Sequence, residues 1–222
     1  MPLIKSISGI RGTIGDKPGE NLTPEDIVKF TAAFVSILLE KKAGKKKTPR
    51  LVIGRDGRTS GEMVRGHVVN TLTKLGIDVV DLGLSTAPTV EIAVEKEGAI
   101  GGIIITASHN PEEWNALKLL NDKGEFISAE KGAKVLEIAE ENNAIVAADI
   151  PGKVMPDDSY LQKHIDAVLK YPLVNAKAIA KKDFRIVVDA INSTGATFVP
   201  ALLRALGVND IIVLNGEING KF

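Results

Sequence analysis

Three polar residues, Ser108, His109 and Asn110, follow directly on the apolar run AIGGIIITA. A short run of this kind, rich in isoleucine and bounded by turn residues, is typical of a buried strand. In an open α/β sheet, ligands collect at the carboxyl ends of the strands, which is where these side chains are expected. A serine there could carry a phosphoryl group, because phosphoryl transfer depends mostly on positioning and charge neutralisation.

Four basic residues could supply that neutralising charge. Arg11 lies in SGIRGT, Arg55 and Arg58 lie in GRDGRTSG, and Lys118 lies just after the serine loop. A purely structural role is also possible for three of these residues. Arg55 and Arg58 could form a local ion-pair network with Asp56 that shapes the turn, and Lys118 could be a lysine at a strand edge. The sequence leaves both interpretations available.

A serine hydrolase is a second way to use Ser108. Its side chain and that of the adjacent His109 diverge, however, whereas a nucleophile and its base must hydrogen-bond to each other. The flanking residues also lack the Gly-x-Ser-x-Gly elbow. Phosphoryl chemistry is therefore favoured. His67 and His164 lie in expected helices and are interpreted as surface or structural residues. The single tryptophan, Trp114, follows the serine loop and could touch a ligand, but a packing role is favoured.

Strands and helices are expected to alternate along the first part of the chain. Helices are predicted over 23–43, from Gly61 to Leu75, from Pro88 and over 128–142, and strands over 50–54, 77–83, 99–107 and 116–121. This alternation predicts an α/β fold, a three-layer α/β/α domain with a mixed, mostly parallel sheet.

A second, similar α/β/α domain is predicted to start after a boundary. The segment AADIPGKVMPDDS has the prolines, glycine and acidic residues of a linker, so the chain divides into a first domain over 1–146, a linker and connecting helix over 147–170, and an incomplete second domain over 171–222. The strand, hydroxyl-glycine turn and Leu-Gly helix end of the first domain recur in the second. From the glycine spacing, the second helix is expected to be about one turn shorter.

Composition limits the partners. The chain has 28 basic and 28 acidic residues and no cysteine, which gives no sign of a nucleic-acid or membrane partner and excludes thiolate chemistry. No signal-peptide pattern precedes the first arginine, so a cytoplasmic protein with a small-molecule partner is the expectation.

Three motifs, which follow each other along the chain as SGIRGT, GRDGRTSG and TASHNP, resemble those of the α-D-phosphohexomutase superfamily in type and in order. This superfamily includes phosphoglucomutase, phosphomannomutase and phosphoglucosamine mutase. The resemblance covers the first domain and the start of the second. It implies that Ser108 is the phosphoryl carrier between the 6 and 1 positions of a hexose or hexosamine phosphate, through a bisphosphate intermediate. It also implies that His109 and Lys118 handle hydroxyl protons and that Arg11 lies close to the phosphoserine.

The same resemblance implies Mg²⁺, held partly by the phosphate on Ser108, and a hexose 1,6-bisphosphate activator. The family's metal-binding aspartate loop does not occur here, NGEING at 215–220 is not expected to be its sugar-binding loop, and Ala116 stands where many members have glycine. We therefore expect the N-terminal part of a phosphohexomutase, inactive in isolation, with glucosamine phosphate favoured as substrate over mannose or glucose phosphate. The alternative is a non-catalytic sugar-phosphate-binding or assembly module of half length. The oligomeric state stays open.

Overall fold

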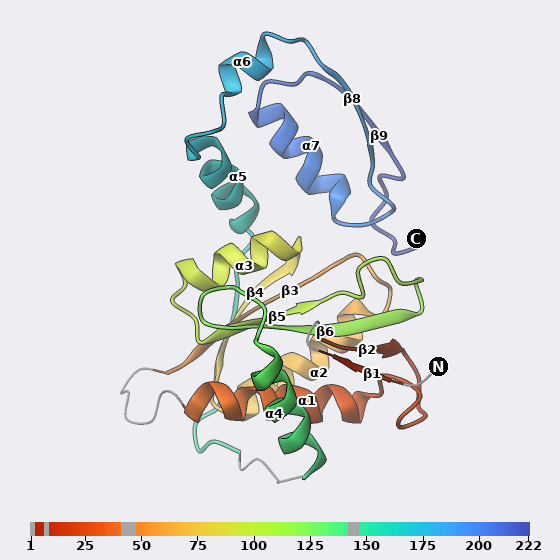
Figure 1. Cartoon of the computed structure of the whole chain (residues 1–222), viewed down its shortest axis with the longest axis vertical. Helices are drawn as coiled ribbons and strands as arrows, with labels where there is room; N and C mark the ends of the chain where they lie inside the picture. The colour runs from red at the N-terminus through yellow and green to blue at the C-terminus, as the bar shows by residue number, and fades with distance from the viewer. Residues whose placement is uncertain (1–2, 7–8, 41–47, 142–146) are drawn as a thin grey trace.

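The computed structural model describes residues 3–6, 9–40, 48–141 and 147–222, which form a larger and a smaller lobe (Figure 1). The larger lobe contains a seven-stranded sheet with strands β1 (Ile4–Ser6), β2 (Gly9–Thr13), β3 (Arg50–Arg55), β4 (Asp78–Leu84), β5 (Gly101–Ile105), β6 (Trp114–Leu120) and β7 (Val154–Pro156). Its helices are α1 (Pro24–Glu40), α2 (Gly61–Lys74), α3 (Ala87–Lys96) and α4 (Ala129–Glu140). The expected ends of the first and fourth helices, near Gly44 and Asn142, lie outside the described residues.

The described strands form a mixed sheet, as predicted, with the order β1-β2-β6-β5-β3-β4-β7. It is not mostly parallel, because three of its pairings are parallel and three are antiparallel. β3 pairs in parallel with β4 and β5, and β4 pairs in parallel with β7, whereas β6 runs antiparallel to β5 and to β2. The reversal at β6 matters for the site, because it pairs Lys118 with Ile104 on the strand that leads to Ser108. Arg11 on β2 pairs with Ala116 on the other side of β6.

Helices cover both faces of the sheet, which gives the three layers. Ile103 and Ile105 of β5 pack toward the helices α1, α2 and α4, and Ile104 packs toward α3 on the opposite face. The apolar run is therefore buried on both sides, as a continuous hydrophobic strand requires. A side chain at Gly102 would approach Val94 of α3 to 2.6 Å, so this glycine permits the close packing of helix on sheet.

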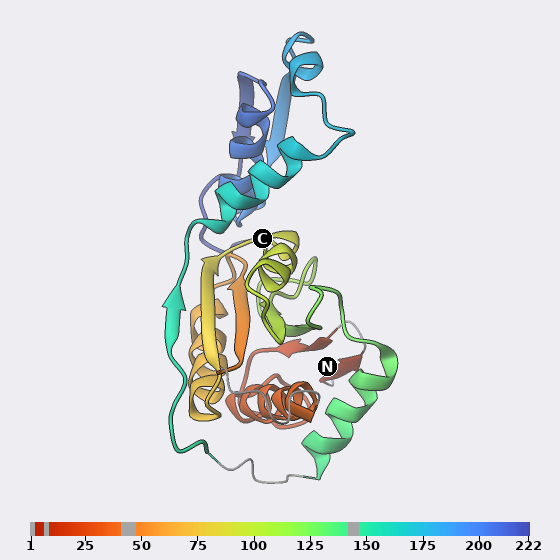
Figure 2. The same cartoon turned by 90° about the vertical axis from the view of Figure 1, so that its left-hand side faces the viewer.

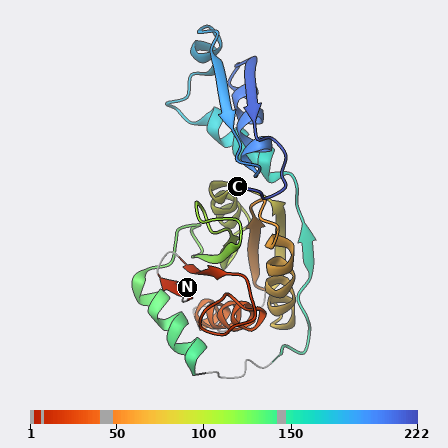
Figure 3. The ribbon, with the colours of Figure 1, turned by 90° about the vertical axis from the view of Figure 1, so that its right-hand side faces the viewer.

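The predicted linker contains a strand that the sequence did not indicate. β7 lies along the edge of the sheet next to β4, with Val79 opposite Val154 (Figures 2 and 3). The chain then enters α5 (Tyr160–Lys170), as expected for the connecting helix. Tyr160 is buried against the α3 face and donates its hydroxyl to Glu97 at 2.7 Å, which fixes the base of this helix on the first lobe.

The smaller lobe repeats the strand-helix-strand unit of the first. After a short helix α6 (Ala176–Ala180), the parallel strands β8 (Arg185–Asp189) and β9 (Asp210–Leu214) are connected by α7 (Gly195–Ala205). α7 has 11 residues and its counterpart α2 has 14, so the predicted difference of about one turn is confirmed. Among the described residues, a helix covers one face of this small sheet and none covers the other, where Val187, Ile212 and Leu214 are 58%, 45% and 48% exposed.

Candidate active site

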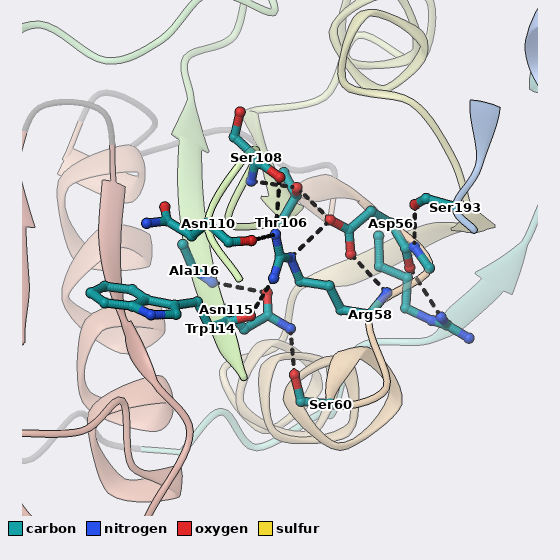
Figure 4. Close-up of polar contacts among 12 residues, drawn as sticks. Asp56, Arg58, Ser60, Thr106, Ser108, Asn110, Trp114, Asn115, Ala116 and Ser193 are labelled. Atoms are coloured by element: carbon teal, nitrogen blue, oxygen red, sulfur yellow. Dashed lines mark hydrogen bonds and ion pairs between the residues drawn. The ribbon is translucent and has the colours of Figure 1, made fainter. Parts of the chain in front are cut away.

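The loop after β5 holds Ser108 in a left-handed backbone conformation, with φ of 56°. Such a conformation is unfavourable for a residue other than glycine by about 1 kcal/mol, so neighbouring contacts must hold it. Thr106 does so: its hydroxyl accepts from the Ser108 amide at 3.0 Å and donates to Asp56 Oδ2 at 2.6 Å (Figure 4). Ser108 is therefore presented, exposed, at the carboxyl end of β5.

Arg58 supports this loop from below. Its Nη2 donates to the carbonyls of Ser108 at 2.9 Å and Asn110 at 2.7 Å, and its Nη1 donates to those of Pro111 at 2.6 Å and Trp114 at 2.9 Å (Figure 4). Its Nε donates to Asp56 at 3.2 Å. All five guanidinium hydrogens are used, and the side chain is 0% exposed.

This geometry decides between the two interpretations of Arg58. A buried guanidinium whose five N–H donors are all engaged has no donor left for a phosphate. Arg58 was expected in the phosphate environment, but its contacts hold the Ser108 loop instead. Burial lowers the pKa of Arg58, and the adjacent Asp56 carboxylate acts in the opposite direction. The paired carboxylate is what makes a buried arginine tolerable at this position.

A cavity of about 480 Å³ lies between the two lobes and brings three of the predicted residues together. Ser108, His109 and Lys118 line it from the first lobe, together with Ser85 and Thr86 at the start of α3. The turn before α7 lines it from the second lobe. A further cavity of about 510 Å³ lies among α1, α2 and α4 and contains none of the predicted residues.

Lys118 lies in a partly desolvated position with charges of both signs around it. Desolvation lowers its pKa from the usual lysine value of 10.5, and Arg11 and Arg58 act in the same direction. Asp56 and Glu91 raise it and offset part of that effect. A lysine whose pKa is lowered toward neutrality can exchange protons with a sugar hydroxyl more readily than an exposed one.

The remaining predicted residues lie around this centre. Arg11 is half-buried and its charge acts on Lys118. Its Nε is buried and has no hydrogen-bond partner among the described residues. Asn110 lies on the loop, and its Oδ1 is also buried, with no partner in the part of the chain that the structure describes. Arg55 forms an ion pair with Glu62 at 3.0 Å and does not line the cavity. Its contacts therefore fit the ion-pair network that was considered as the alternative to phosphate binding.

The residues interpreted as structural have packing partners. Trp114 is 4% exposed and packs with Ala107 and Ala116. The Ala116 methyl group, at the position where glycine was noted as common, therefore fills space in this cluster. His164 Nδ1 is 2.8 Å from the hydroxyl of Thr89, and burial lowers the pKa of this histidine.

Two groups of residues were missed by sequence reasoning. Asp56 was considered only as an ion-pair partner and Thr106 only as a member of the TASHNP motif, yet together they fix the backbone of Ser108. The turn before α7 was also missed, although Asp189, Ser193 and Thr194 line the cavity. The repeat contained the signal for this turn, because it aligns the segment with GRDGRTSG at the same end of the first sheet.

The segment NGEING also has a position in the structure. It follows β9 and contacts the 57–59 turn of the first lobe, where a side chain at Gly220 would come within 2.5 Å of the Gly57 carbonyl oxygen. Within the described residues there is no group of three or more histidine, cysteine, aspartate or glutamate side chains that could hold a metal ion. None of the helices in the described ranges has the length and apolarity needed to cross a membrane.

Comparison with known proteins gives one consistent result. Residues 3–145 match the family model of phosphoglucomutase/phosphomannomutase alpha/beta/alpha domain I, and residues 162–222 match that of domain II. A phosphoglucomutase/phosphomannomutase of Thermococcus kodakarensis is 35% identical over 96% of this chain and 45% of its own length. A phosphoglucosamine/phosphogalactosamine mutase of Sulfurisphaera tokodaii is 30% identical over 96% of this chain and 44% of its own.

The solved structures agree on the fold. A phosphoglucomutase/phosphomannomutase family protein from Burkholderia thailandensis superposes with a TM-score of 0.72 at 23% identity, over 99% of this chain and 46% of that one. The chain thus spans a little under half the length of the curated relatives that it matches.

Proposed function

Because this chain belongs to the phosphoglucomutase/phosphomannomutase family, we propose that its two domains form the phosphoryl-carrying part of a phosphohexomutase. The enzyme interconverts the 6-phosphate and 1-phosphate of a hexose or hexosamine. Among the substrates, glucosamine phosphate leads, followed by mannose and glucose phosphates. The proposal rests on family membership and on the site, and the isolated chain is expected not to turn over.

One observation carries the proposal. Ser108 shares a cavity between the two lobes with His109 and Lys118. Its carbonyl accepts a hydrogen bond from the Arg58 guanidinium. A phosphoryl carrier needs an exposed hydroxyl in a fixed position, and the Thr106 and Arg58 contacts provide that. Two groups capable of proton transfer lie on the same cavity wall.

In the proposed step, a hydroxyl oxygen of the sugar phosphate attacks the phosphorus of phosphorylated Ser108. The new oxygen–phosphorus bond forms as the bond from phosphorus to Ser108 Oγ breaks, and the hydroxyl proton passes to His109 or Lys118. The same group then gives this proton to the departing Ser108 Oγ, so the products are a hexose bisphosphate and the free serine hydroxyl. The reverse transfer, from the other phosphate of the bisphosphate, restores the carrier.

The family resemblance also implies Mg²⁺ on the phosphoserine, and it would neutralise phosphoryl charge when bound. The described residues do not provide a complete site for it, because no suitable cluster of ligating side chains is found among them. The described part of the chain would contribute a phosphate oxygen carried by Ser108.

Incubation of the purified chain with hexose 1,6-bisphosphates and Mg²⁺, followed by mass spectrometry of peptides, tests the proposal. We expect one phosphoryl group on Ser108, none in the Ser108→Ala variant, and faster labelling from the glucosamine compound than from the glucose or mannose compound. Binding of hexose phosphate without labelling would favour the non-catalytic module, and absence of both would overturn the proposal. Labelling of Ser108 by a fluorophosphonate would favour the hydrolase instead.

A further inference from the structure

The turn that carries Arg58 is also a contact point between the lobes. The Gly57 amide donates to the hydroxyl of Ser193, in the turn before α7, at 3.1 Å (Figure 4). This hydrogen bond is buried and joins residues 136 positions apart. The second lobe therefore contacts the peptide immediately before the arginine that holds the serine loop.

Two glycines allow the backbones to meet at this point. A side chain at Gly57 would come within 2.9 Å of Ile218 and 3.1 Å of Ser193. A side chain at Gly220, where φ is +72°, would come within 2.5 Å of the Gly57 carbonyl oxygen and 3.0 Å of the Arg58 Cα. Contacts this short leave no room for a Cβ atom, so the segment 218–222 lies directly on the Gly57–Arg58 turn.

Phe222 completes the contact from the second lobe. Its ring lies over the Arg58 guanidinium, with Cζ 4.5 Å from the ring centroid. At this distance an aromatic face attracts a guanidinium, and it also shields the cation from water. Phe222 of the second lobe therefore shields the guanidinium that donates the four hydrogen bonds to backbone carbonyls around Ser108.

The covering segment is itself attached to the second lobe. Asn192 donates its side-chain amide to the Lys221 carbonyl at 2.7 Å, and its carbonyl accepts from the Gly220 amide at 3.1 Å. Asn192 and Ser193 are neighbours in the turn before α7, so one turn holds both the covering segment and the Gly57 amide. A movement of the second lobe would shift these contacts together.

We propose that Phe222 and Ser193 are positioning residues for Ser108, acting through the Gly57–Arg58 turn. When the second lobe is seated, Arg58 is shielded and its carbonyl bonds hold the Ser108 loop in its strained conformation. When the lobe moves away, water competes for the guanidinium and the loop relaxes. The coupling between the second lobe and the Ser108 loop does not depend on the proposed function. Its importance for catalysis does, because it rests on the proposed role of Ser108.

Amide hydrogen exchange of the 222-residue chain measures the coupling directly. In Phe222→Ala we expect the amides of Ser108 and Asn110 to exchange about two- to fivefold faster, as the loss of a cation–π contact predicts. Phe222→Tyr keeps an aromatic face and should restore the wild-type rates. Phe184→Ala is the matched control, because Phe184 is 47% exposed against 41% for Phe222 and lies away from the Arg58 turn.

Ser193→Ala provides an independent test, because it removes the bond to Gly57 from a different residue. We expect about a fivefold acceleration of the same two amides, the usual effect of one lost buried hydrogen bond. The single tryptophan gives a second readout: Trp114 is buried and its carbonyl bonds to Arg58, so its fluorescence should shift to longer wavelength in both variants.

A general loss of stability must be separated from loosening of the loop. The amides of β3, in the core of the first lobe, serve as the internal reference in every variant. Acceleration of the loop amides relative to β3 supports the proposal, and equal acceleration of both, or of neither, overturns it. None of these measurements requires phosphorylation, so a failure of the proposed function would leave their outcome unchanged.

Discussion

Arg58 and Ser108 are separated by 50 positions in the chain and are joined by a hydrogen bond of 2.9 Å from the guanidinium to the serine carbonyl. The bond is made to the backbone, so it fixes where the hydroxyl is held without engaging the hydroxyl itself. The same guanidinium holds three further carbonyls of the loop. The site therefore has a buried cation that shapes the loop and an exposed serine, which we propose as the phosphoryl carrier.

Replacement of Arg58 by lysine should destabilise the protein despite keeping the charge. A lysine has three donors on a single nitrogen and cannot reach five acceptors arranged around a planar fork, so buried carbonyls are left unpaired. We expect a loss of about 2 to 4 kcal/mol in the free energy of unfolding, measured by urea denaturation. Arg204→Lys, at an exposed position of α7, should change it by less than about 0.5 kcal/mol. A tolerated Arg58→Lys would show that the fork is unnecessary.

Thr106 offers a test of the hydroxyl that links Asp56 to Ser108. Thr106→Val keeps the shape of the side chain but removes both hydrogen bonds, so we expect a loss of about 1 to 2 kcal/mol in stability. Because the left-handed backbone of Ser108 loses its support, phosphorylation of Ser108 should also slow. Thr106→Ser retains the hydroxyl and should recover most of the wild-type phosphorylation rate. Equal rates in the valine and serine variants would argue against this role.

The pKa of Lys118 should be measurable below 10.5 by NMR titration of its side chain, because desolvation lowers it. Glu91→Gln should lower this pKa further, since the Glu91 carboxylate stabilises the ammonium ion. Glu95→Gln, at an exposed position on the same helix, is the control and should leave the titration nearly unchanged. An unchanged Lys118 titration in Glu91→Gln would show that the two charges do not interact.

The lowered pKa of Lys118 also determines how the free energy of unfolding depends on pH. The unfolded chain binds the Lys118 proton more tightly than the folded chain, so the stability contribution rises with pH between the folded-state pKa and 10.5. Below that window both states are protonated and the full desolvation cost is present. Lys118→Met should therefore be more stabilising relative to wild type at pH 7 than at pH 10, as measured by urea denaturation. A difference that grows with pH would contradict this assignment.

Local sequence patterns were sufficient for most elements of the first domain. The run at β5 was identified because its residues are apolar on both faces, and α2 because glycines bound an amphipathic segment. β7 was not identified, since three residues, one of them proline, carry no strand pattern. It forms because Val154 meets the free edge of β4, which is a long-range contact.

Motifs and periodicity within short segments were enough to identify the family, the mixed α/β architecture, the repeated unit and the serine loop. The role of each cation could be assigned only from the folded chain. Arg55, Arg58 and Lys118 look equally available in the sequence, yet one pairs with Glu62, one is buried beneath the loop and one lines the cavity. The three cations differ because strand register and the position of the second lobe set their burial and hydrogen-bond partners. Both bring together residues that are far apart in the chain.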